Sequence, residues 1–192
     1  MDDRALLEQV RRGDERAFSR LYTRHQPAIY RYAMHMCGAA AADDVVQDTF
    51  VALLRRPAKY DASRGPLVSY LFGIARHHVL KRLAIERPLD SLDEADVDAA
   101  AGSAADNVTP LDAASRAELV AQVRDAIRTL PPAYREVVVL CELQDMDYAA
   151  AAAIMQCPIG TVRSRLHRAK AMLTTKLATL QSASLATPRP AP

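Results

Sequence analysis

A short basic segment near the C-terminal end carries side chains that could bind DNA. Residues 158–173 read PIGTVRSRLHRAKAML, and apolar residues recur there at spacings of three and four: Ile159, Val162, Leu166, Ala169 and Leu173. That pattern predicts a helix with one buried side. Off the buried side, near the helix start, lie Arg163, Ser164, His167 and Arg168. Arginine can bond guanine in a bidentate fashion, so this face is suited to reading base edges in a major groove.

The elements before this helix complete a helix-turn-helix pattern. Asp147 is a candidate N-cap for a helix over 148–155, and the break QCP separates that helix from the next. Pro158 is expected at the first position of the basic helix, where its missing N–H costs nothing. Thr161 and the free amides of that first turn can contact a phosphate. A second helix that presents its early residues to the major groove is the geometry of this motif.

A second candidate site combines a turn with another basic helix. Turn-forming residues fill positions 61–66 (Asp61, Ser63, Gly65 and Pro66), and a core stripe follows at Val68, Phe72, Ala75, Val79 and Leu83. The remaining helix surface carries Arg76, His77, His78, Lys81 and Arg82, with Tyr70 among them. Cations beside aromatic and hydroxyl groups are suited to single-stranded nucleic acid, whose unstacked base a loop can hold.

A third polar set lies at the start of a predicted helix in ADDVVQDTFVALLRR. Asp43, Asp44, Gln47 and Asp48 form a face where acidic groups suit the helix dipole. Such a face can dock a partner protein, or it can simply be solvated above a core, and its residues alone leave both alternatives open.

Composition limits the fold and the function class. The chain has 192 residues, is rich in Ala, Leu and Arg, and lacks Trp, which favours helices over sheets. No apolar run reaches the ~20 residues of a membrane span, and the acidic start does not resemble a secretory signal. Three widely separated cysteines indicate reduced thiols in the cytoplasm. His35 and Cys37 are two positions apart and point away from each other on a helix, so we expect no metal site.

Charge divides the chain into blocks. Residues 1–87 carry 15 basic and 10 acidic groups, residues 88–118 carry one and eight, and residues 119–192 carry nine and five. We therefore predict an all-α protein with two helical domains, over 10–87 and 119–177, joined by a flexible acidic linker over 88–118. The Pro- and Ala-rich tail, 178–192, is expected to be disordered. Pro27 is expected to kink or divide the helix in which it lies.

Taken together, these motifs resemble the sigma-70 family of RNA polymerase sigma factors, and within it the extracytoplasmic-function (ECF) subfamily. LPPAYREVVVL followed by CPIGTVRSRLHRAKAML is similar to region 4 of the family. ADDVVQDTFVALLRR and YDASRGPLVSYLFGIARHHVLKRL are similar to region 2. The resemblance covers about residues 10–87 and 119–177.

The resemblance implies a promoter-specificity subunit, with no enzymatic activity and no cofactor. It implies contact with core RNA polymerase by Asp43, Asp44, Val46, Gln47, Asp48, Phe50 and Val51. It implies binding of single-stranded minus-ten DNA by Asp61, Ser63, Arg64, Gly65, Tyr70, Arg76, His77 and Lys81. It implies binding of duplex minus-thirty-five DNA by Pro158, Gly160, Thr161, Arg163, Ser164, His167 and Arg168. It also implies a cytoplasmic location and an anti-sigma factor, which, if membrane-bound, would hold the chain at the inner membrane.

The sequence departs from the family in three places. Gln156 stands where a turn glycine is common, an Ala149–Ala153 run replaces a more varied stretch, and His77 stands where Asn is common. A left-handed Gln156 would cost about 1 kcal/mol more than glycine. The alternative interpretation is an ordinary helix-turn-helix regulator that binds promoter duplex without polymerase.

Overall fold

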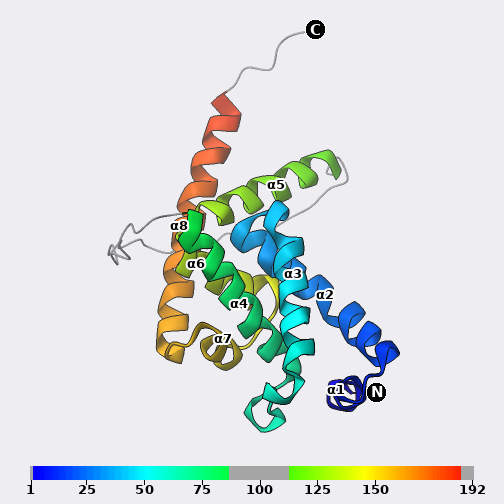
Figure 1. The fold of residues 1–192 in the computed structure, drawn as a ribbon. Coiled ribbons are helices and arrows are strands. Elements are labelled where there is room, and N and C mark those ends of the chain that lie inside the picture. The colour runs from blue at the N-terminus through cyan, green and yellow to red at the C-terminus, as the bar shows by residue number, and fades with distance from the viewer. Residues whose placement is uncertain (1, 87–112, 187–192) are drawn as a thin grey trace.

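The structure, a computed structural model, is all helical in the part that it describes, residues 2–86 and 113–186. The N-terminal half contains α1 (Asp3–Arg11), α2 (Glu15–Cys37), α3 (Ala39–Arg55) and α4 (Leu67–Glu86), with the short 3-10 turns η1 (Pro57–Lys59) and η2 (Ala62–Arg64) before α4. The C-terminal half contains α5 (Ala113–Thr129), α6 (Pro132–Val138), the π-helical turn η3 (Val139–Leu143), α7 (Tyr148–Met155) and α8 (Ile159–Ala186). This arrangement confirms the predicted fold class of two helical regions (Figure 1).

Helix boundaries differ from the sequence-based ones at several points. The predicted linker lies outside the described residues from 88 to 112, whereas residues 113–118 belong to α5. Helix α8 continues past residue 177 to Ala186, and residues 187–192 lie outside the described part. Pro27 lies inside a single helix, α2, so the expectation that it would divide this helix is wrong. Buried side chains before and after it, Leu21 and Ile29 among them, anchor both parts of α2 to one core.

Helix α1 lies almost entirely before residue 10, where the first predicted domain begins. Asp2 caps α1 by accepting a hydrogen bond from the Ala5 amide at 2.7 Å. Leu6, Leu7 and Val10 are buried, and α1 packs on α2. The spacing of these three residues is the signal that could have predicted α1.

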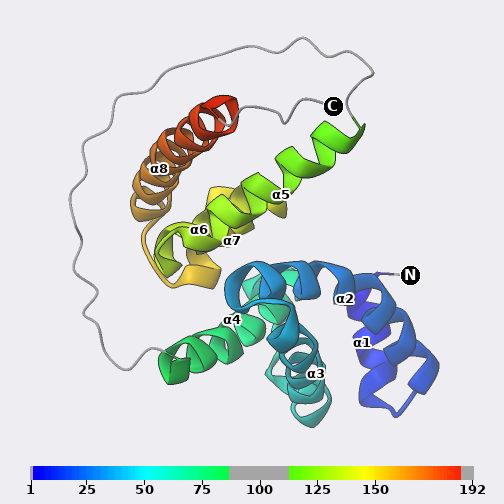
Figure 2. The same ribbon diagram turned by 90° about the horizontal axis from the view of Figure 1, so that it is seen from above.

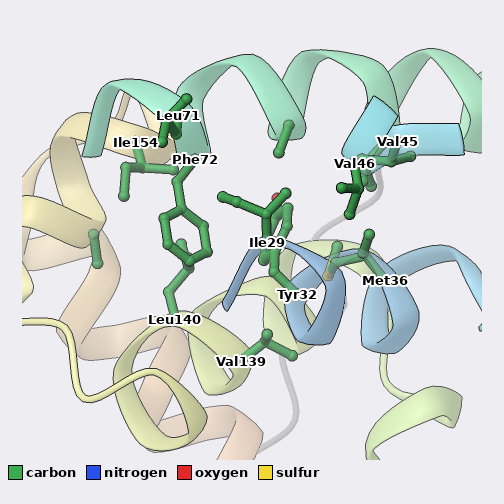
Figure 3. Packing of buried hydrophobic residues seen from close by; sticks show 14 of the residues in the cluster. Ile29, Tyr32, Met36, Val45, Val46, Leu71, Phe72, Val139, Leu140 and Ile154 are labelled. Carbon is green, nitrogen blue, oxygen red and sulfur yellow. The ribbon is translucent and has the colours of Figure 1, made fainter. Parts of the chain in front are cut away.

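The two halves share one continuous hydrophobic core. Helices α2 and α4 of the first half lie against α6, η3 and α7 of the second, and Figure 2 shows the two halves meeting along these elements. Phe72 of α4 stacks edge-on against Tyr32 of α2, with ring centroids 5.4 Å apart. Figure 3 shows Leu140 and Ile154, from the second half, beside the Phe72 ring. Two domains joined by a flexible linker, as the sequence predicts, do not imply this contact.

Candidate nucleic-acid interface

The helix-turn-helix is built as its residues predict, with one boundary displaced. Asp147 accepts a hydrogen bond from the Ala150 amide at 2.7 Å and so caps α7. Gln156 adopts the left-handed conformation, with φ 56° and ψ 44°, which confirms the expected turn geometry. Pro158 precedes the first helical residue, and its carbonyl accepts from the Thr161 and Val162 amides at 2.9 and 3.3 Å. It is therefore at the N-cap rather than at the first helical position, a one-residue difference.

One side of α8 is buried and its early polar side chains are exposed. Val162, Leu166 and Ala169 face the core. The exposed residues of the predicted duplex-binding set are Pro158, Gly160, Arg163, Ser164 and His167. Thr161 and Arg168 are half-buried. The structure therefore brings the whole set to one helix start, with most of it open to a ligand.

Two neighbours orient this face. The Arg163 guanidinium lies over the Tyr148 ring, 5.9 Å from its centroid, which favours one orientation of a long cation. The Ser164 hydroxyl donates to the Thr161 carbonyl at 3.1 Å. Its oxygen can still accept a further hydrogen bond.

The turn before α4 is held by its own side chains. Asp61 accepts hydrogen bonds from the amide and hydroxyl of Ser63 at 2.9 and 2.7 Å. These bonds favour the carboxylate and lower the pKa of Asp61. The Tyr60 hydroxyl closes the turn by donating to the Gly65 carbonyl at 3.1 Å. Gly65 has φ 136°, a backbone conformation that a side chain would strain.

A cavity of about 500 Å³ collects most of the predicted single-strand-binding residues. It is lined by Asp61, Arg64, Gly65, Tyr70, Arg76 and His77 from the first half. Ser63 and Lys81, from the same predicted set, are exposed on the surface and are not among its lining residues. The same cavity is also lined by Ala153, Ile154 and Gln156 from the second half. Residues near the helix-turn-helix turn therefore border the surface predicted to hold a DNA strand.

Arg76 has a protein partner across the two halves. Its Nε donates to Glu136 Oε1 at 2.8 Å, and the hydroxyl of Tyr32 donates to the same oxygen at 2.8 Å. Glu136 is buried, with 3% of its surface exposed. Burial, followed by the nearby carboxylate, raises the pKa of Tyr32 well above its ordinary value. Neither Glu136 nor Tyr32 was a sequence-based candidate, because nothing in the local pattern shows which distant residue a buried carboxylate will meet.

The predicted polymerase-contacting set is divided by burial. Asp43, Asp44, Gln47 and Asp48 are exposed, and Val51 is half-buried. Val46 and Phe50 are each 2% exposed and belong to the core, so they support this face from beneath rather than form it. Arg82 of α4 pairs with Asp44 and Asp48 at 3.2 and 3.8 Å. The exposed polar face is therefore fixed against α4.

Within residues 2–86 and 113–186, no three His, Cys, Asp or Glu side chains come close enough together to hold a metal ion. No helix in the part of the chain that the structure describes is both long and apolar enough to cross a lipid bilayer.

Comparison with known protein families decides between the two interpretations of these surfaces. Residues 21–87 match the family model of sigma-70 region 2, and residues 121–173 match that of sigma-70 region 4. The chain is 33% identical over 184 residues to the ECF RNA polymerase sigma-E factor of Haemophilus influenzae, covering 92% of this chain and 96% of that protein. This chain belongs to the sigma-70 family.

Other similarities agree with this assignment. The RNA polymerase sigma-H factor of Pseudomonas aeruginosa is 32% identical over 176 residues, which cover 88% of this chain and 90% of that one. The solved structure of CnrH, in complex with the cytosolic domain of CnrY, superposes with a TM-score of 0.68 at 30% identity. That match covers 92% of this chain and 97% of CnrH. The chain is thus an ECF-type sigma factor, and the alternative of a regulator that acts without polymerase is not favoured.

Proposed function

We propose that this sigma factor binds core RNA polymerase and recognises a promoter through two separate surfaces. The observation that carries the proposal is the pairing, within one chain, of the exposed α8 face with the turn and basic face of α4. The first fits duplex DNA, and the second fits a single strand with an unstacked base.

Each surface has a proposed role. The face formed by Asp43, Asp44, Gln47 and Asp48 docks on the core enzyme. The turn over Asp61–Gly65, with Tyr70, Arg76, His77 and Lys81, captures the non-template strand of the minus-ten element. The start of α8, with Arg163, Ser164, His167 and Arg168, reads the minus-thirty-five element as duplex. The family domains 10–87 and 119–177 supply these roles, and binding energy rather than catalysis by this chain drives strand separation.

We also propose a cytoplasmic location and regulation by an anti-sigma factor. The family resemblance supports both, and CnrH, to which this chain is similar, forms a complex with the cytosolic domain of another protein, CnrY. A membrane-bound anti-sigma factor would hold the chain at the inner membrane.

Run-off transcription with purified core polymerase on a promoter library tests the proposal. Transcripts that start at selected promoters only when this chain is added are the expected result, and the selected sequences identify both elements. An Asp48→Arg variant should lose affinity for core polymerase while retaining its helical content. Promoter-specific duplex binding by a chain that directs no initiation with core polymerase would instead favour an ordinary regulator.

A further inference from the structure

A second cavity, of about 700 Å³, lies next to the single-strand cavity, and we call it the α1 cavity. Helix α1 forms one of its walls with Arg4, Glu8 and Arg11. The turns η1 and η2 form the other wall, and Figure 1 shows α1 beside these turns, which follow α3. Tyr60 and Asp61 line both cavities, so these two residues form the partition between them.

Hydrogen bonds fix the walls of the α1 cavity. Arg11 Nη2 donates to the Pro57 carbonyl at 2.8 Å and to the Tyr60 carbonyl at 3.3 Å. Arg11 Nη1 pairs with Glu8 Oε1 at 2.5 Å. Leu7, which also lines the cavity, is 2% exposed and anchors α1 in the core. Because these walls are already held in place, they lose little conformational freedom when a ligand binds.

The charges around the α1 cavity balance. Arg4 and Arg11 are cationic, Glu8 and Asp61 are anionic, and all four side chains are exposed. A backbone phosphate is bound by a surplus of lysine and arginine side chains, so a balanced lining does not favour it. The ligand that fits is uncharged and has both hydrogen-bond donors and acceptors.

The lining also suits a flat ring with polar edges. Leu7, Ala58 and Ala62 supply apolar surface, and Tyr60 borders the same space. Around them, carboxylates accept hydrogen bonds and guanidinium groups donate them. An unstacked nucleobase has the matching properties, since its faces stack on apolar or aromatic side chains and its edges form hydrogen bonds.

The position of the α1 cavity indicates which nucleic acid supplies the base. The Tyr60 ring lies 5.6 Å from the Tyr70 ring on the side of the single-strand cavity, and the Tyr60 carbonyl accepts from Arg11 on the other side. A strand that is held in the single-strand cavity and continues past the turn therefore reaches the α1 cavity next. Lys59 and Arg64 are exposed on the turn and are available to the phosphates between the two bases.

The polar groups of the α1 cavity distinguish between bases. Asp61 accepts both bonds from Ser63 on Oδ1, and Glu8 pairs with Arg11 through Oε1. Oδ2 of Asp61 and Oε2 of Glu8 can therefore accept from a ligand, and the exposed Arg4 can donate to one. Guanine offers O6 and N7 to an arginine fork and N–H groups to a carboxylate. Thymine has no amino group to offer.

We propose that the α1 cavity is a second base site, which takes an unstacked guanine of the non-template strand next to the base captured at the turn. This inference rests on the proposed function. Arg4 contacts the acceptor edge of the guanine, and the carboxylates of Glu8 and Asp61 accept from its N–H groups. The sigma factor therefore prefers guanine at one position beside the captured base.

An abasic scan of an opened promoter tests the second base site. The DNA is a fork junction made from a promoter recovered by run-off transcription, with the non-template strand unpaired across and beyond the minus-ten element. The protein is the full chain bound to core polymerase. Each unpaired base is replaced in turn by an abasic unit, and affinity is measured by competition. Two positions should lose affinity: the base captured at the turn and a guanine beside it.

Arg4→Ala identifies the base that occupies the α1 cavity. This variant should bind the intact fork junction about fivefold more weakly or worse, as expected for loss of a bidentate base contact. It should bind no more weakly than the unaltered chain when the second position is abasic or carries thymine. Arg12→Ala is the matched control, since Arg12 is exposed at the end of the same helix and does not line the cavity. It should change affinity by no more than about twofold on every DNA.

Ala58→Trp tests the α1 cavity without relying on one polar contact. Ala58 is exposed and lines this cavity but not the single-strand cavity. Filling the space with a ring should abolish the dependence on the second position and leave the dependence on the captured base unchanged. Ala5→Trp adds the same ring to an exposed position of α1 outside the cavity and should alter neither.

A loss for Arg4→Ala that is equal on the intact and on every abasic DNA would overturn the inference, because a long-range charge effect has that result. So would a scan with no second sensitive position, or a second position that accepts thymine as well as guanine. If the unaltered chain confers no polymerase-dependent binding of the fork junction, the proposed function fails, and the inference with it. Sensitivity at the captured base alone would leave the proposed function standing, so the two failures are distinguishable.

Discussion

The two surfaces proposed to bind DNA differ in how accessible the fold leaves them. The start of α8 is open: Arg163, Ser164 and His167 are exposed, and their nearest contacts are local. The corresponding surface of α4 is divided: His77 and Lys81 are exposed, whereas Arg76 is bonded to Glu136 of the other half. A basic helix is therefore not by itself an available binding site, because its accessibility is decided by tertiary contacts.

The largest expected effect comes from removing the aromatic ring at the contact between the halves. Phe72 is 1% exposed and packs on Tyr32, so Phe72→Ala should lower the free energy of unfolding by about 3–5 kcal/mol. Urea titration followed by circular dichroism measures the change. A matched truncation, Leu53→Ala, lies in the N-terminal core away from α7. A loss no larger than that of Leu53→Ala would mean that the contact between the halves contributes no more stability than the N-terminal core does.

Arg163→Ala should weaken binding of minus-thirty-five duplex by about 1–3 kcal/mol if this side chain reads a base. Because Arg163 is already exposed, the loss should be the same in the free chain and in the polymerase complex. His77→Ala should affect binding only in the complex, where single strand is present. Fluorescence anisotropy with duplex and single-stranded probes measures both. A loss for Arg163→Ala that appears only with polymerase would remove the contrast between the two surfaces.

Gln156→Gly should stabilise the chain by about 1 kcal/mol, since Gln156 has a left-handed backbone that favours glycine. Thermal unfolding measures this gain. Gln156 also lines the cavity beside α4. The measured change in stability therefore compares the cost of its left-handed backbone with the contribution of its side chain at that cavity. Unchanged or lower stability would mean that the Gln156 side chain contributes more at the cavity than its backbone costs.

The smallest expected effect is a dependence on pH at the contact between the halves. Burial, then Arg124 of α5 and Arg31 of α2, lowers the pKa of His35 below 6.5. The folded chain therefore binds this proton less readily than the unfolded chain. The contribution of neutral His35 to the stability of the fold is fully present above pH 6.5. It is lost as the pH falls below 6.5 through the lowered pKa of His35 in the folded chain. Unfolding measured between pH 7.5 and 5 should show a shallower slope for His35→Gln. Identical slopes for the two proteins would exclude His35 as a cause.

Much of the fold could be predicted from the sequence because its signals are local. The spacing of Val162, Leu166 and Ala169 predicts the buried side of α8, and the Asp147 cap follows from side-chain chemistry. The left-handed turn at Gln156 is implied by the family resemblance, since glutamine itself does not favour it. Contacts between distant residues could not be predicted in the same way. Glu136 and Arg76 are 60 residues apart, and no periodicity connects them. Val46 and Phe50 were assigned to a docking face by resemblance, whereas their burial depends on how α3 packs.

Run-off transcription with the purified chain, on one selected promoter with each element scrambled in turn, tests the central claim most directly. The account predicts a transcript that needs core polymerase, this chain and both promoter elements. A chain that yields no promoter-dependent transcript, or one that is indifferent to scrambling of either element, would contradict it.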